Sequence, residues 1–235
     1  MPTQPANPLQ RIAMLSVHTC PLATLGGKET GGMNVYVREL ARELGRRGLA
    51  VDVFTRSQDP AIPRISYRLG NQARVIHLPA GPQQPYNKNL IYNHLDEFVT
   101  GILAFAHAEN IHYDVLHSHY WLSGLAAERL RQIWGTPIVH MFHTLARLKN
   151  QVAQSPAELE PEQRAICEGE IMRFADRVVA ATTLEREQMQ QLYGADPANI
   201  MIVPPGVDLD LFRPVRCEDA RASLGLPPDQ HMILF

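Results

Sequence analysis

The sequence predicts a doubly wound parallel α/β sheet, Rossmann-like in its strand–helix alternation. Three observations support this. Short apolar runs rich in β-branched residues alternate along the 235 residues with longer segments of helical period. Those short runs are apolar on consecutive positions, as expected of strands that helices cover on both faces. Two long loops follow strands directly, where ligands bind in open α/β sheets.

The elements follow one another in a regular order. The candidate strands are Arg11–Val17, Ala50–Arg56, Ala73–Leu78, Asp114–His119, Pro137–Phe142, Arg177–Ala181 and Asn199–Val203. Helical period covers 34–47, 89–109, 122–134, 157–175 and 183–193. The long loops are Thr19–Gly32, after the first strand, and residues 144–160, after the fifth.

Three segments are expected. Residues 1–10 form a disordered tail with three prolines, and residues 11–206 form one complete domain. Residues 207–235 form a linker and a truncated stub of a second domain, ending in His231–Phe235, which looks like a beginning strand. This last segment is expected either to be mobile or to pair with a second copy through 231–235, which would give a homodimer.

Composition excludes several functions. With 22 Lys and Arg against 24 Asp and Glu, the net charge is −2, so no global basic field exists to hold nucleic acid. The apolar runs fall short of the ~20 residues of a membrane helix, and no signal peptide precedes them. Three cysteines without a C-x-x-C pair indicate a reducing compartment, so a cytoplasmic protein is expected.

A glycine-rich loop over residues 26–34 runs straight into the first helix. Glycines let the backbone approach a ligand closely, and free N–H groups at a helix start attract phosphate or carboxylate. The loop is neither G-x-G-x-x-G nor G-x-x-x-x-G-K-[ST], which disfavours a dinucleotide site and a P-loop. It is interpreted either as a flexible turn or as an anion or sugar site.

Histidines close three of the predicted strands. His117 and His119 share a strand face, but no third ligand can be identified, so no metal site is predicted. His18-Thr19 and His143-Thr144 each end a strand. Taking those two strand ends as adjacent, we expect the pairs to share a pocket, with Tyr120 and Trp121 facing a polar ligand.

Several segments, in this order, resemble the amino-terminal half of a retaining GT-B glycosyltransferase. They are His18-Thr19, Gly31–Val37, Val53–Arg56, His117–Gly124, His143–Ala146 with Lys149-Asn150, and Val203–Asp208. The resemblance is greatest to the D-inositol-3-phosphate (mycothiol) glycosyltransferase group, and sucrose-phosphate synthases are more distant. It implies that this half binds the acceptor, and that a second domain holds most of the nucleotide-sugar site.

The resemblance also implies individual roles. His18 and Gly32 would contact the donor, and His143 would lie beneath the reacting centre and offer its backbone carbonyl. Glu29 departs from the aspartate usual in this group. The acceptor and its phosphate would be held by Glu29, Thr30, Gly31, Gly32, Met33, Asn34, Lys88, Tyr120, Thr144 and Arg164. By pattern alone, Lys88 and Arg164 are surface charges, yet a Lys and an Arg fork suit a phosphate dianion.

By this resemblance, the protein moves a sugar, such as N-acetylglucosamine from UDP-GlcNAc, to a phosphorylated polyol such as 1D-myo-inositol 3-phosphate. Retention would follow front-face attack assisted by the departing diphosphate, without a second carboxylate. The nucleotide sugar is a co-substrate, and no cofactor is expected. Because the cationic leaving-group residues lie in the second domain, residues 1–235 alone are expected to be inactive.

Other functions stay open. A transferase of the sucrose-phosphate-synthase type would take fructose 6-phosphate, and a non-catalytic sugar-phosphate binding module would share this domain. A nicotinamide or flavin oxidoreductase should show G-x-G-x-x-G after the first strand and an acid after the second, and neither is present. A phosphorylated acceptor is preferred because two cations converging on a neutral ligand would repel each other.

Overall fold

The computed structural model describes residues 9–24, 26, 30–70 and 72–233. The chain divides into two compact units, Met1–Pro204 and Pro205–Phe235. Most of the predicted amino-terminal tail, residues 1–8, lies outside the described residues. Leu9 and Gln10 precede the first strand without helix or strand structure.

The first unit is built on a sheet whose described residues form eight strands in the order β3-β4-β2-β1-β5-β6-β7-β8. All neighbouring pairs are parallel except β3 with β4. The strands are β1 (Arg11–Leu15), β2 (Ala50–Arg56), β3 (Ile65–Ser66), β4 (Ala73–Leu78), β5 (Val115–His119), β6 (Ile138–Met141), β7 (Arg177–Ala180) and β8 (Ile200–Ile202). The seven predicted strands are therefore present and the parallel sheet is confirmed.

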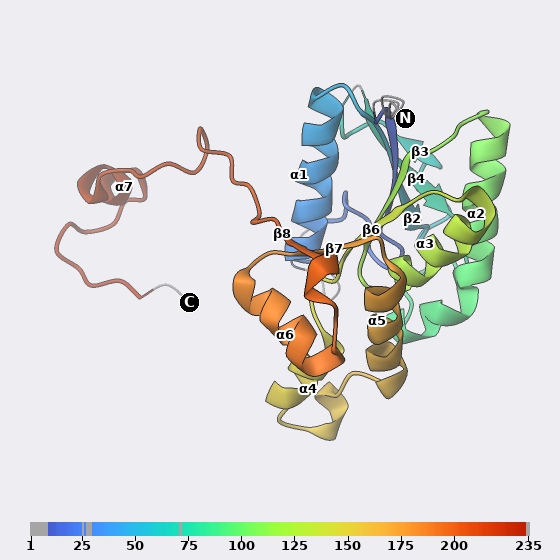
Figure 1. Cartoon of the computed structure of the whole chain (residues 1–235). Coiled ribbons are helices and arrows are strands. Elements are labelled where there is room, and N and C mark those ends of the chain that lie inside the picture. The colour runs from blue at the N-terminus through green and yellow to red at the C-terminus, as the bar shows by residue number, and fades with distance from the viewer. Residues whose placement is uncertain (1–8, 25, 27–29, 71, 234–235) are drawn as a thin grey trace, which may run out of the picture. The chain divides into compact units, whose positions relative to one another are not determined.

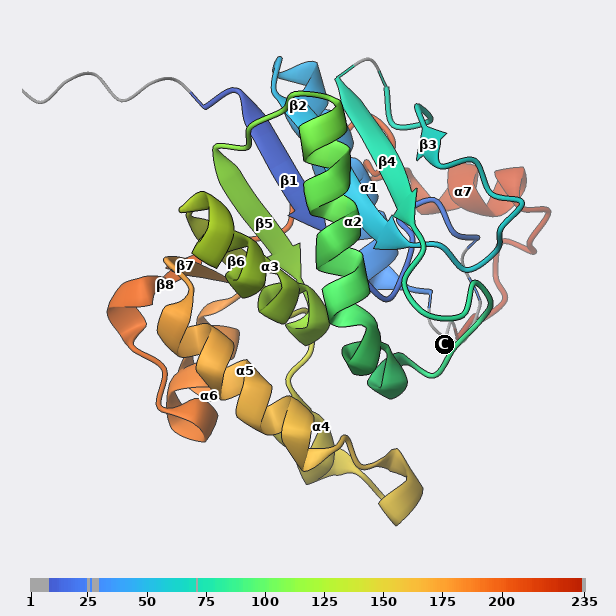
Figure 2. The same ribbon diagram turned by 90° about the vertical axis from the view of Figure 1, so that its right-hand side faces the viewer.

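Helices cover both faces of this sheet (Figure 1). In the view of Figure 2, α2, α3 and α5 lie in front of the sheet and α1 lies behind it. The α-helices of the unit are α1 (Gly32–Arg46), α2 (Leu95–Ala108), α3 (Trp121–Trp134), α4 (Ala146–Val152), α5 (Glu162–Phe174) and α6 (Thr183–Tyr193). Short 3₁₀ segments occupy η1 (Lys88–His94), η2 (Pro156–Glu158) and η3 (Pro197–Asn199).

Alternate residues of β1 supply two separate cores. Ala13 and Leu15 belong to the larger core, which the residues of α2, α3 and α5 complete. Met14 points to the opposite face and packs in a smaller core with Val37 of α1 and Val53 of β2. Because successive side chains of a strand point to opposite faces, apolar residues on consecutive positions fill both layers.

The chain order places the topological switch point between β1 and β5. From β1 the chain proceeds outward to β2 and β4, and α2 then carries it back to β5 on the other side of β1. Ligands of open α/β sheets bind in the crevice outside the carboxyl ends of the strands at such a point. The residues that follow β1 and β5 are therefore the first place to look for a site.

Three predicted boundaries are wrong. The loop 144–160 contains the helix α4, and the segment predicted as a helix over 157–175 is helical only from Glu162. Pro161 explains that start, because proline has no N–H and disfavours helical backbone in the residue before it. The helical period over 89–109 divides into η1 and α2, and the side chain of Asn87 caps η1 by accepting a bond from the N–H of Asn89.

The second unit carries one helix within its described residues, α7 (Cys217–Ser223). Its segment 231–233 is not a strand, so the predicted beginning of a strand there is wrong for these residues, and residues 234–235 lie outside the described residues. A strand needs hydrogen-bonding neighbours, and none of the described residues pairs with this segment. The homodimer expected through 231–235 stays a prediction.

Replacing Gly124 with alanine is expected to lower the free energy of unfolding by about 1–3 kcal/mol. A Cβ at this position of α3 would lie 2.7 Å from Ile171 Cδ1 and 3.0 Å from His140 Cε1, both buried. Gly169 of α5 is the matched control, because its added Cβ would meet Tyr193 only at 3.8 Å. Gly169→Ala should stabilise by roughly 0.5–1 kcal/mol through helix propensity. Equal effects in urea denaturation would contradict the packing argument.

Candidate functional site

The site is centred on Tyr120, at the carboxyl end of β5. The Arg164 guanidinium carbon lies 4.6 Å from the centroid of the Tyr120 ring, and the His18 ring lies 4.3 Å from it. His18 follows β1, so these contacts lie at the switch point. His18 Nδ1 is buried and has no hydrogen-bond partner among the described residues. A buried polar atom of this kind costs about 1–3 kcal/mol unless a ligand or water satisfies it.

Two residues at strand ends have backbone conformations that side chains rarely adopt. Tyr120 has φ 72° and ψ 155°, a region that glycine alone populates readily, and His143 has φ 64°. Such strain costs of order 1–3 kcal/mol per residue and gathers at functional sites. Both residues lie among the predicted site residues, after β5 and β6.

Four further histidines lie close together at the carboxyl ends of β5 and β6. His119 Nδ1 and His143 Nε2 are 3.0 Å apart, the rings of His117 and His119 are 4.3 Å apart, and His140 Nδ1 bonds Ser118 Oγ at 2.7 Å. The N–N contact requires one of the two nitrogens to donate and the other to accept. Tyr36 of α1 touches His143, with ring centroids 5.2 Å apart, so the first turns of α1 adjoin the end of β6.

Burial keeps these imidazoles uncharged. It lowers the pKa of His18 to about 3, helped by the positive charges of Lys88 and Arg164, and the pKa of His117 and His143 to about 4. It holds the pKa of His119 and His140 well below the usual value. Among the residues described, no group of three or more His, Cys, Asp or Glu side chains could hold a metal ion.

Arg164 is held from three sides although it is 1% exposed. Its Nε donates to Glu168 Oε1 at 2.7 Å, and its Nη1 lies 3.0 Å from Glu160 Oε2. Its Nη2 donates to both the carbonyl and the Oγ1 of Thr144, at 2.8 and 2.9 Å. Arg164 on α5 and Thr144 after β6 are therefore brought together, as the resemblance implies, and Tyr120 lies under the same guanidinium.

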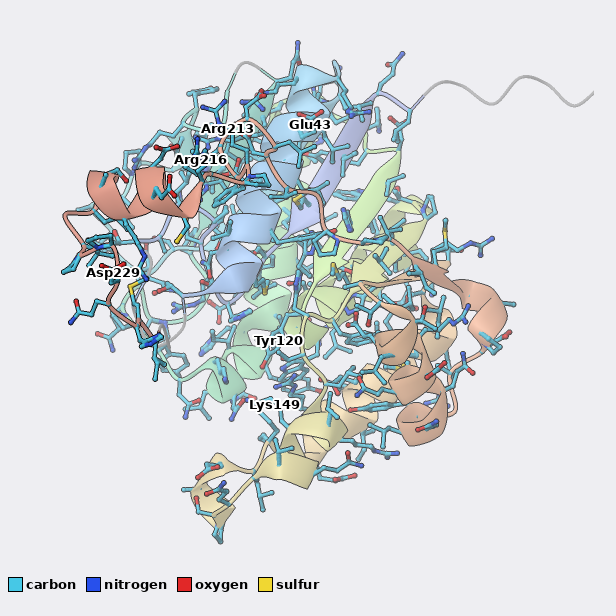
Figure 3. All side chains as sticks on the ribbon, turned by 90° about the vertical axis from the view of Figure 1, so that its left-hand side faces the viewer. Glu43, Tyr120, Lys149, Arg213, Arg216 and Asp229 are labelled. Atoms are coloured by element: carbon cyan, nitrogen blue, oxygen red, sulfur yellow. The ribbon has the colours of Figure 1, made fainter. Side chains whose placement is uncertain are left out.

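Two lysines converge on the carboxylate that faces Arg164. Lys88 Nζ lies 4.0 Å from Glu160 Oε1, and Lys149 of α4 donates a close hydrogen bond to the same oxygen. Figure 3 labels Lys149 on α4 and Tyr120 at the end of β5. Burial raises the pKa of Glu160, but the bond from Lys149 and the charges of Arg164 and Lys88 outweigh it and hold the pKa below its usual value.

In the glycine loop the two glycines are exposed, whereas the side chain of Asn34 is buried. Gly31 and Gly32 are exposed, and a Cβ at either would meet nothing within 4 Å. Asn34 is buried and its amide donates to Thr19 Oγ1 at 2.6 Å and to the carbonyl of Cys20, while its oxygen accepts from the Gly31 N–H. Asn34 thus joins the start of α1 to the loop after β1. The half-buried Thr30 and Met33 flank the glycines, and Glu29 lies outside the described residues.

Three interpretations made from the sequence need correction. The ends of β1 and β6 are not adjacent, because β5 lies between them. Trp121 is 2% exposed and packs in the larger core, stacked 5.9 Å from Tyr92, so it does not face a ligand. Lys88 and Arg164 do not face an uncompensated site, because Glu160 lies against both.

Sequence reasoning missed the acidic partners of this site. Glu160 and Glu168 each stand four residues from Arg164, a spacing that can be found in the sequence, although only Glu168 shares α5 with the arginine and Glu160 lies just before that helix. Glu168 is fully buried and also accepts from the N–H of Ala146 and the hydroxyl of Tyr193. That side chain ties α4, α5 and α6 together.

A hollow of about 530 Å³ lies elsewhere, at the amino ends of the strands, where Arg11, Ala50 and Asp114 are among its lining residues. Its only carboxylate among the lining residues, that of Asp114, accepts from the N–H groups of Gln10 and Arg11 at 2.9 and 2.8 Å. This carboxylate holds the start of β1, at the amino ends of the strands. The strained backbone and the buried charges both favour the carboxyl ends as the site.

Comparison with known proteins identifies the family of the chain. Residues 31–206 match the family model described as a glycosyl transferase 4-like domain. The chain is 44% identical over 228 residues to a D-inositol 3-phosphate glycosyltransferase of Actinosynnema mirum, and 46% identical over 233 residues to one of Xylanimonas cellulosilytica. These matches cover 97% and 96% of this chain but 54% and 55% of the relatives. The chain thus spans about half the length of these curated relatives.

Solved structures give the same fold. A sucrose-phosphate synthase of Thermosynechococcus elongatus superposes with a TM-score of 0.82 at 35% identity, over 94% of this chain and 53% of that one. The HepE protein of Anabaena superposes with a TM-score of 0.59 at 16% identity, over 92% of this chain and 50% of that one, and supports the fold alone. The chain belongs to the glycosyl transferase 4-like family, and its doubly wound sheet is the one found in the GT-B glycosyltransferases that it resembles.

Proposed function

We propose that this chain is the acceptor-binding half of a retaining glycosyltransferase that moves a sugar from a nucleotide donor to a phosphorylated polyol, 1D-myo-inositol 3-phosphate. One observation carries the choice of a phosphorylated acceptor. Lys88, Lys149 and Arg164 converge at the carboxyl ends of the strands around one buried carboxylate. The names of the relatives support inositol 3-phosphate as the acceptor. As the donor we propose UDP-N-acetylglucosamine, which the family resemblance implies.

In this proposal the chain acts mainly by position. Residues 11–206 hold the acceptor, and residues 207–235 begin the part that holds the donor. Lys88, Thr144 and Arg164 bind the phosphate, and Tyr120 and the loop 29–34 hold the ring. His18 and Gly32 contact the donor. The backbone carbonyl of His143 stabilises the positive charge that develops on the transferred sugar, while the leaving diphosphate takes the acceptor proton.

The neutral histidines suit this chemistry. With pKa values of about 3 and 4, His18 and His143 carry no charge at neutral pH, so they add no repulsion toward an oxocarbenium-like sugar.

None of the helices among residues 9–24, 26, 30–70 and 72–233 has the length and hydropathy of a membrane span. We propose that the reaction takes place in the cytoplasm, on water-soluble substrates.

A second candidate acceptor is fructose 6-phosphate. It is favoured by the likeness to sucrose-phosphate synthase, with a TM-score of 0.82 at 35% identity. The same cations would bind its phosphate. The test is sugar transfer by the complete gene product, supplied with UDP-sugars and with each acceptor in turn, and with the anomeric configuration of the product read by NMR. No transfer to any phosphorylated acceptor, or an inverted product, would refute the proposal.

Lys88→Met is expected to weaken binding of inositol 3-phosphate by about 10–100-fold, because a charge-assisted hydrogen bond contributes roughly 1.5–3 kcal/mol. Binding of unphosphorylated inositol should stay nearly unchanged, which makes it the control ligand. Calorimetric titration of the 235-residue chain measures both. Equal weakening for the two ligands would mean that Lys88 does not bind the phosphate.

A further inference from the structure

The carboxylate of Glu160 lies among three cations, where a bound anion could also lie. Its Oε2 lies 3.0 Å from Arg164 Nη1, and its Oε1 accepts from Lys149 and lies 4.0 Å from Lys88 Nζ. The residue is 8% exposed. Both carboxylate oxygens are thus engaged by the positive groups that the proposed function assigns to the acceptor.

The backbone of Glu160 is fixed independently of its carboxylate. Its N–H donates to Asn150 Oδ1 at 2.8 Å, and its carbonyl accepts from Asn150 Nδ2 at 3.2 Å. These reciprocal bonds hold the segment between η2 and α5 against α4 whatever the side chain does. The neighbouring Leu159 is 52% exposed, and Pro161 is exposed, so the segment lies at the surface of the unit.

The charges of the side chains around Glu160 favour a ligand that is more negative than a single carboxylate. Among the described side chains that pair here, Lys88, Lys149 and Arg164 supply three positive charges and Glu160 and Glu168 two negative ones, which leaves a net charge of +1 for these five residues. Glu168 is committed elsewhere, because it also accepts from Ala146 and Tyr193. A phosphate monoester carries about −1.5 to −2 near pH 7 and offers three acceptor oxygens. It can therefore replace the Glu160 carboxylate on these cations with a better match of charge.

We propose that Glu160 is an internal competitor of the acceptor phosphate, which holds Lys88, Lys149 and Arg164 together in the unliganded chain and must yield them when a phosphorylated ligand binds. This inference rests on the proposed function, because it takes the ligand to be a phosphorylated acceptor. It assigns to Glu160 control over affinity and to Lys149 a place among the phosphate-binding cations.

The test compares Glu160→Gln with Glu162→Gln, which removes the same charge from an exposed position two residues away on the first turn of α5. Glutamine keeps the shape of Glu160 and its backbone bonds to Asn150. Affinities of the 235-residue chain for inorganic phosphate, inositol 3-phosphate and free inositol are measured by calorimetry, and melting temperature is followed with and without phosphate.

Glu160→Gln is expected to bind both phosphate ligands at least tenfold more tightly, since a competing negative charge beside the cations is gone. Free inositol should bind as before, and Glu162→Gln should change each affinity less than threefold. Without phosphate, Glu160→Gln should melt at a lower temperature, because a carboxylate that contacts three cations is gone, and phosphate should restore it. Glu160→Ala, tested in the same way, should show the same direction of change.

Phosphate affinity that is unchanged or weaker in both Glu160 variants, or undetectable in every protein, overturns the inference. Failure of the proposed function has a different signature. If the complete gene product transfers no sugar but Glu160→Gln binds inorganic phosphate tenfold more tightly, the competition stands and the transferase assignment falls. If transfer to inositol 3-phosphate occurs and the variants bind no more tightly, only the role of Glu160 falls.

Discussion

Arg164→Met is expected to lower the free energy of unfolding by about 3–5 kcal/mol. The substitution leaves Glu168, which is fully buried, and Glu160, which is nearly so, without the guanidinium between them. Removing one partner of a buried ion pair is costly because the other charge stays in a medium that solvates it poorly. Urea denaturation followed by circular dichroism measures the loss.

Arg173→Met is the control for this prediction. Arg173 is an exposed arginine on the same helix, with a 3.3 Å bond to the carbonyl of Gly169, so its replacement should change stability by no more than about 0.5 kcal/mol. A loss below 1 kcal/mol for Arg164→Met would mean that the buried pair is dispensable to the fold.

Acid is expected to destabilise the chain steeply between pH 6.5 and pH 4. Burial lowers the pKa of His117 and His143 to about 4 and that of His18 to about 3, whereas unfolding returns each to an ordinary value near 6.5. Below pH 6.5 these histidines are therefore protonated in the unfolded chain but stay neutral in the folded chain. Stability is complete above pH 6.5 and falls as the pH drops, by about 1.4 kcal/mol per pH unit for each such histidine.

The measurement is the urea midpoint and slope at pH 7.5, 6 and 5. Glu160, whose pKa is lowered from 4.5 in the folded chain, acts in the same direction only below its ordinary pKa, so it contributes little at these three pH values. The stability of His143→Gln should depend less steeply on pH than that of the unmodified chain, because one histidine with a lowered pKa is gone. A stability that is level from pH 7.5 to pH 5 would show that these imidazoles are solvated in the folded state.

The sheet could be predicted because each of the seven predicted strands carries apolar residues on consecutive positions and the long helices bury apolar residues. The pattern fails where burial is slight. Helix α4 buries only Ala146 of its seven residues, so it carries no apolar stripe to read. Strand β3 has two residues, and it is placed by pairing with β4 rather than by its own composition. Short elements of this kind depend on their neighbours.

The site could be predicted in part, for a different reason. Strand ends pointed to His18, Tyr120 and Thr144, because ligands of open α/β sheets bind there. Arg164 came from the family resemblance alone, since an arginine on a helix after a polar loop looks like a surface charge. Its burial follows from two carboxylates four residues away on either side, a relation that hydrophobic periodicity ignores.

Under the proposed function, the bonds of Glu168 limit how the acceptor could change. Arg164, α4 and α6 all depend on that one carboxylate, so any exchange of the arginine for a residue suited to a neutral ligand also removes support from two helices. A protein that changed its acceptor by replacing Arg164 would first need compensating substitutions around Glu168. Lys88 and Lys149 are partly exposed, with side chains 25% and 42% accessible, and replacing either leaves the bonds of Glu168 in place. New acceptor preferences should therefore arise in directed evolution at the two lysines before they arise at the arginine.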